Sequence, residues 1–74
     1  MQLDVLAVSD AERIMDYLRK YQEATDQELQ SDLQMSESTE CQLRFELVRA
    51  GYIADSGRTR KTQGGLDATI WKIV

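Results

Sequence analysis

The sequence contains no proline and no histidine, and it has a single cysteine, Cys41, among its 74 residues. One thiol without a histidine is not the ligand set of a structural zinc site, and it excludes an internal disulfide. We therefore expect no metal and no cofactor. The sparse cysteine is also typical of a reducing, cytoplasmic setting.

Long apolar runs are missing as well, so we expect no membrane-spanning helix. The opening stretch MQLDVLAVSD lacks the cationic region of a signal peptide. Its apolar residues lie in residues 1–8, which we interpret as an N-terminal arm that either extends the core or reaches a second subunit. Residues 9–74 are expected to form one small domain.

Signatures of catalysis are absent too. No histidine is available as a general base, and no serine or cysteine stands in a recognisable nucleophile setting. The stretch GRTRKTQGG at residues 57–65 has glycines and basic residues, but not in the order of a phosphate-binding P-loop. We expect no catalytic residues and no enzymatic activity.

The charges that are present are unevenly divided. Residues 1–55 carry five Lys/Arg and twelve Asp/Glu, a net charge of −7, whereas residues 56–74 carry four Lys/Arg and one Asp, a net charge of +3. The sum is the −4 of the whole chain. An acidic body with a basic C-terminal segment indicates local, not global, attraction to a polyanion.

Two stretches with the same sequence pattern predict helix starts. In SDAE and TDQE, Ser9 and Thr25 are N-cap residues, and Glu12 and Glu28 follow three residues later as capping-box partners. These caps predict helices over residues 10–21 and 26–34. A third helix is predicted from Ser36 to about residue 50, because a glycine follows there as a helix C-cap.

The remainder of the chain predicts a β-hairpin. Strand-forming residues begin at Tyr52 and return over residues 68–74. Between them Gly64 and Gly65 permit the positive φ angles of a tight hairpin turn. The order of elements is therefore helix, helix, helix and hairpin, an α+β fold.

The stretch ELQSDLQMSESTECQLRFELVRAGYI, followed by the basic tail, resembles the helix-turn-helix and wing of winged-helix DNA-binding domains. The resemblance implies a winged helix-turn-helix fold with three helices followed by a C-terminal β-hairpin wing. It also implies binding of double-stranded DNA by a small bacterial or phage-type transcriptional regulator or accessory factor. Because a domain of this size makes few phosphate contacts, we expect it to act as a homodimer or with a protein partner. The DNA-binding residues that it implies are Ser38, Thr39 and Gln42 in the third helix and Arg58, Arg60, Lys61 and Thr62 in the wing.

The third helix departs from that family in two respects. Glu37 and Glu40 stand at its start, where a phosphate-lined groove would repel them. Cys41, Phe45 and Val48 form a second apolar stripe, which is either core or a face for a partner. The alternative function is thus a protein-interaction module without direct DNA binding. In that case the basic hairpin residues serve solubility.

Overall fold

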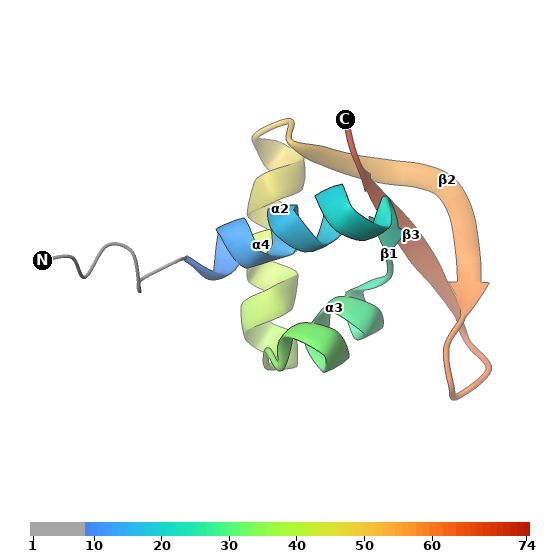
Figure 1. Cartoon of the computed structure of the whole chain (residues 1–74). Helices are drawn as coiled ribbons and strands as arrows, with labels where there is room; N and C mark the ends of the chain where they lie inside the picture. The colour runs from blue at the N-terminus through green and yellow to red at the C-terminus, as the bar shows by residue number, and fades with distance from the viewer. Residues whose placement is uncertain (1–8) are drawn as a thin grey trace, which may run out of the picture.

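The computed structural model describes residues 9–74, and the arm predicted for residues 1–8 lies outside that range. Within it, three helices precede a β-hairpin, so the predicted α+β fold class is confirmed, and the arrangement is compatible with a winged helix-turn-helix (Figure 1). The elements are α2 (Asp10–Tyr21), β1 (Glu23–Ala24), α3 (Asp26–Leu33), α4 (Glu37–Arg49), β2 (Ile53–Lys61) and β3 (Asp67–Ile73).

Hydroxyl caps begin all three helices, as predicted. The Glu12 N–H donates to Ser9 Oγ at 3.1 Å, which is one of the two hydrogen bonds of a capping box at α2. At α3 both bonds of the capping box form: the Glu28 N–H donates to Thr25 Oγ1 at 3.2 Å, and the Thr25 N–H donates to Glu28 Oε1 at 3.0 Å. The Thr25 side chain thereby satisfies an N–H group that the helix itself leaves unpaired.

Gly51 ends α4 in the predicted way. Its φ angle is +87°, the left-handed region that glycine enters at little cost. The Gly51 N–H donates to the Val48 carbonyl at 3.0 Å, and the Tyr52 N–H donates to the Leu47 carbonyl at 2.9 Å. This pair of bonds is a Schellman motif, and it turns the chain directly into β2.

The sheet contains a strand that the sequence did not predict. β1 is only two residues long and joins the hairpin to give the order β1-β3-β2, with both strand pairs antiparallel. Glu23 pairs with Lys72 and Ala24 pairs with Trp71. A two-residue strand is too short to show an alternation of apolar and polar residues, so the sequence does not reveal it. Only its pairing with β3 defines it as a strand.

The hairpin loop is wider than the predicted turn at Gly64 and Gly65. It covers the residues between Lys61 and Asp67, and within it only Gly65 has a positive φ, at +82°. The Thr62 N–H donates to the Leu66 carbonyl at 2.8 Å and so closes the loop. The two glycines are therefore inside a five-residue loop and do not form a two-residue turn by themselves.

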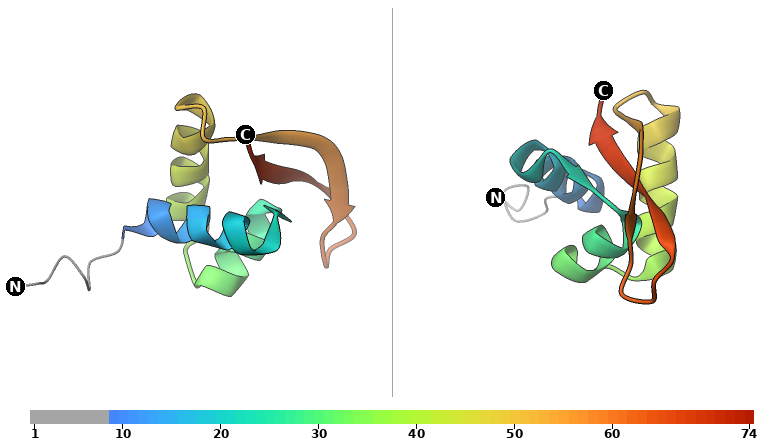
Figure 2. Two further views of the ribbon diagram at one scale, coloured as in Figure 1. Left: turned by 45° about the horizontal axis from the view of Figure 1, so that its top comes forward. Right: turned by 90° about the vertical axis from the view of Figure 1, so that its right-hand side faces the viewer.

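All three helices pack on one side of the sheet, as the two views in Figure 2 show. The core between these layers draws a residue from nearly every element: Ile14, Leu18, Ala24, Leu29, Met35, Leu47 and Ile53. Trp71 is partly buried against it, as expected for a core residue of a small domain. Among residues 9–74, no helix is long and apolar enough to cross a membrane.

Candidate nucleic-acid interface

The N-terminal half of α4 presents the three helix residues that the resemblance implied. Ser38, Thr39 and Gln42 are all exposed, and Ser36 caps the helix by accepting from the Thr39 N–H at 3.2 Å. Gln42 lies 3.5 Å from Glu46 one turn later on the same surface. Hydroxyl and amide groups at a helix start are suited to contacts with base edges or phosphates.

Glu40 does not lie on the exposed surface of α4 that would face a DNA groove, contrary to expectation. Its side chain is fully buried, with 0% exposure, whereas Glu37 is exposed as predicted. The reason is helical periodicity: Glu40, Leu43 and Leu47 recur at three- and four-residue spacing and share the packed face of α4. The same spacing was visible in the sequence and would have placed Glu40 in the core.

The basic hairpin residues are positioned by a bulge in β2. The pairing register shifts between Asp55 and Thr59. Within this bulge the Gly57 N–H donates to Asp55 Oδ1 at 2.8 Å, and the Arg58 N–H donates to Ser56 Oγ at 3.2 Å. Bulges bend a strand and re-aim its side chains, and Figure 1 shows β2 turning sharply along its length.

Each of the three basic residues of the predicted wing contacts a carboxylate of this chain. Arg58 forms an ion pair with Glu23, and Arg60 Nε lies 3.1 Å from Glu28 Oε2. Lys61 Nζ lies 3.1 Å from Asp67 Oδ1 at the base of the hairpin loop. The basic charge of the predicted wing is thus paired with acidic residues of the same chain. Two of these acidic residues, Glu23 on β1 and Glu28 on α3, belong to the acidic body.

Thr62, the last predicted wing residue, has a local structural role. Its Oγ1 accepts from the Leu66 N–H at 3.3 Å inside the hairpin loop, and its side chain is half-buried. Beside it, a groove of roughly 400 Å³ separates the loop from α3. Polar residues make up its lining: Thr25, Gln27, Glu28, Ser31, Asp32, Lys61, Thr62 and Gln63.

The apolar stripe of α4 is divided in the structure. Phe45 is 57% exposed, whereas Val48 is partly buried against the core and Cys41 is turned toward acidic residues. Only Phe45 therefore presents a large apolar surface to solvent from the predicted set of three. The α4 surface toward solvent mixes this ring with polar residues on either side.

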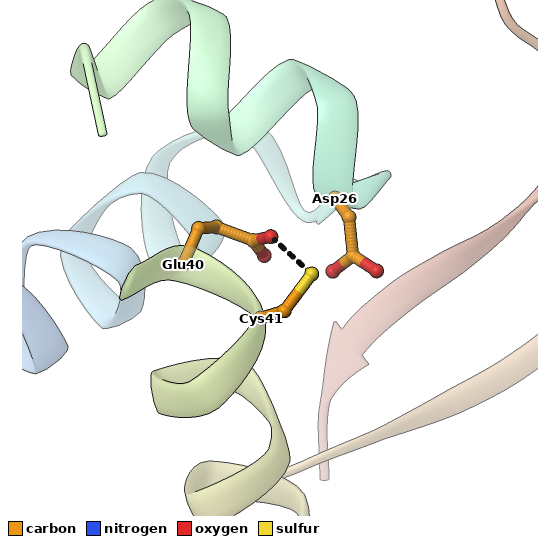
Figure 3. Close-up of side chains that lie close together, drawn as sticks. All are labelled: Asp26, Glu40 and Cys41. Carbon is orange, nitrogen blue, oxygen red and sulfur yellow. Dashed lines mark hydrogen bonds between the residues drawn. The ribbon is translucent and has the colours of Figure 1, made fainter. Parts of the chain in front are cut away.

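A buried polar cluster joins α3 to α4 below that surface (Figure 3). Glu40 Oε1 accepts from Gln30 Nε2 at 2.9 Å and from the Cys41 thiol at 3.4 Å, and its Oε2 has no hydrogen-bond partner among the described residues. Burial and then the adjacent Asp26 carboxyl raise the pKa of Glu40 to about 7. Burial likewise raises the pKa of the Cys41 thiol, more than its acidic neighbours do.

Three potential metal ligands meet in this cluster. One ligand atom each from Asp26, Glu40 and Cys41 lie within 4.8 Å of one another. However, both Asp26 oxygens already accept hydrogen bonds from Arg44, at 2.9 and 3.0 Å. A divalent cation would sit beside that guanidinium and would have to displace the thiol proton. The donor set therefore favours a protonated Glu40 over a bound cation.

No protein-family model matches the chain, and no curated protein matches its sequence.

Proposed function

We propose that this protein is a winged-helix DNA-binding module that contacts duplex DNA through the N-terminal half of α4 and the basic hairpin. The observation that carries the proposal is one of placement. The exposed Ser38, Thr39 and Gln42 lie on the half of α4 that points toward the same end of the molecule as the hairpin loop (Figures 1 and 2). An exposed polar helix start beside a cationic hairpin is the arrangement of groove and backbone contacts that winged helices use.

The ion pairs of the hairpin are compatible with this function. The Lys61 and Asp67 side chains are 70% and 62% exposed, so that pair is largely solvated, whereas Arg58 is 62% exposed and its partner Glu23 is 28% exposed. Exposed ion pairs contribute only about 0–1 kcal/mol each, and a phosphate can replace a carboxylate at small cost. Since so small a domain makes few phosphate contacts, we propose that two copies act together on DNA.

A titration with random-sequence duplex DNA at low and moderate salt tests the proposal. Arg58→Ala plus Arg60→Ala should weaken binding across sequences and flatten the salt dependence by about one to two units, because each lost phosphate contact removes about one. Arg19→Ala plus Arg49→Ala is the matched control: it removes the same charge from exposed positions on α2 and at the end of α4. Equal effects of the two pairs, or no binding by the wild type, would refute the wing assignment.

The exposure of Phe45 favours a second candidate, a module that binds another protein through α4. A solvated aromatic ring at the centre of a helix face is a common anchor of protein interfaces. Loss of a protein partner by a folded Phe45→Asp variant, with DNA binding absent in the wild type, would support it.

A further inference from the structure

Four side chains form one charged network between the hairpin and the body of the protein. Glu23 pairs with Arg58 through Oε1 and lies 3.7 Å from Arg60 Nη1 through Oε2. Glu28 lies 3.1 Å from Arg60 Nε and also accepts from Arg60 Nη2 at 3.3 Å. Two guanidinium groups thus share two carboxylates.

The sheet order shows that this network joins two strands that are not adjacent in the sheet. β1 and β2 are both paired with β3, so Arg58 and Arg60 on β2 reach across the central strand to Glu23 on β1. Strands two places apart are separated by roughly 10 Å, a span that only a long side chain covers. The bulge at Ser56 and Gly57 precedes Arg58 directly and alters the direction of β2 at that point.

Carboxylates and phosphates present the same chemistry to arginine. Both offer two oxygens to the planar fork of N–H donors, and both are favoured by the same charge. Arg60 already contacts Glu28 at two points: Nη2 donates a hydrogen bond to Oε1 at 3.3 Å, and Nε lies 3.1 Å from Oε2 as an ion-pair contact without a hydrogen bond. A DNA phosphate that approaches Arg58 or Arg60 therefore meets donors that the protein's own carboxylates occupy.

We infer that Glu23 and Glu28 act as an internal anionic competitor that occupies the phosphate-binding arginines of the hairpin, so that DNA must displace them to bind. The inference rests on the proposed function, since it concerns regulation of that same site. Competition lowers affinity for any anionic partner and removes weak, non-specific contacts first. Because these pairs are still partly solvated and therefore weak, the expected restraint is modest, about three- to tenfold in affinity.

A double-mutant cycle separates this competition from general charge repulsion. Its four proteins are the wild type, Glu23→Gln plus Glu28→Gln, Arg58→Ala plus Arg60→Ala, and the quadruple variant, each titrated with random-sequence duplex DNA at low salt. The glutamine pair should tighten binding by about three- to tenfold in the wild type, and clearly less where the arginines are absent. Glutamine also retains the acceptor that the capping box of α3 requires.

A second pair of acids supplies the control for net charge. Glu12→Gln plus Asp16→Asn removes the same charge from exposed positions on α2, and Asp16 is itself paired with an arginine, Arg19. This pair should change the affinity equally in both arginine backgrounds. If the glutamine pair at Glu23 and Glu28 also acts equally in both, the competition does not exist, although DNA binding stands.

Absence of DNA binding in all four proteins overturns the proposed function, and the inference with it. Should Glu28→Gln impair folding, Glu23→Gln alone against Arg58→Ala gives the same cycle through their direct pair, without touching the α3 cap. Coupling in that cycle supports the competition, and strict additivity overturns it.

Discussion

Arg44 donates two hydrogen bonds to Asp26, from Nε to Oδ1 at 2.9 Å and from Nη2 to Oδ2 at 3.0 Å. The same guanidinium lies 4.4 Å from the centre of the Trp71 ring. One side chain of α4 thereby contacts the first turn of α3 and the central strand β3. This contact links α3 and α4 to the sheet. It therefore holds α4 in position relative to both α3 and β3.

Removal of Arg44 should therefore be costly. The Arg44 and Asp26 side chains are only 19% and 29% exposed, so Arg44→Ala leaves a carboxylate partly desolvated next to Glu40. We expect a loss of about 2–3 kcal/mol in the free energy of unfolding, measured with urea. Arg19→Ala, which breaks a solvated pair with Asp16 at 59% and 65% exposure, should cost less than about 1 kcal/mol. Equal losses for the two variants would contradict a structural role of the Arg44 pair.

Glu40 should make stability depend on pH in an unusual direction. Its pKa is raised from 4.5 to about 7 in the folded protein, so between these values the native state holds a proton that the unfolded state has released. The free energy of unfolding then falls as pH rises from about 4.5 to about 7, and above that the contribution is constant. The full effect is on the order of 3 kcal/mol.

The measurement is the difference between the wild type and Glu40→Gln across that pH range. Glutamine resembles the protonated carboxyl, because it can accept from Gln30 and donate toward Asp26. The variant should gain stability relative to the wild type as pH rises, and Glu46→Gln, at an exposed position of the same helix, is the charge-matched control. Parallel curves for Glu40→Gln would show that Glu40 titrates normally.

The sequence was a good guide wherever the signal is local. Hydroxyl caps and Gly51 predicted the helix bounds within a residue or two, because these groups act on the backbone beside them. The partners of Arg58 and Arg60 were not predictable in this way. They depend on β1 and on the bulge in β2, which exist only once β3 has paired on both edges.

Gly51 offers a direct test of one local signal. At a φ of +87°, an added Cβ is strained whatever the free space, so Gly51→Ala should cost about 1–2 kcal/mol in unfolding free energy. Gly64→Ala is the matched control, because Gly64 does not have a positive φ and an added Cβ meets only Thr62 Oγ1, at 3.8 Å. Its stability should change by only a few tenths of a kcal/mol. If Gly64→Ala lowered the unfolding free energy as much as Gly51→Ala, the positive φ of Gly51 in the Schellman motif would not be the cause of the loss.

Phe45 distinguishes core from interface on α4. With 57% of its surface exposed, Phe45→Asp removes little packing and should lower the free energy of unfolding by no more than about 0.5 kcal/mol. Leu47→Ala, two residues later but only 9% exposed, should cost about 2–3 kcal/mol by comparison. Sedimentation of the folded Phe45→Asp variant then reports on assembly: a shift from dimer to monomer assigns the ring to a subunit contact. Unfolding of Phe45→Asp to the same degree as Leu47→Ala would instead place Phe45 in the core and end its candidacy as a partner contact.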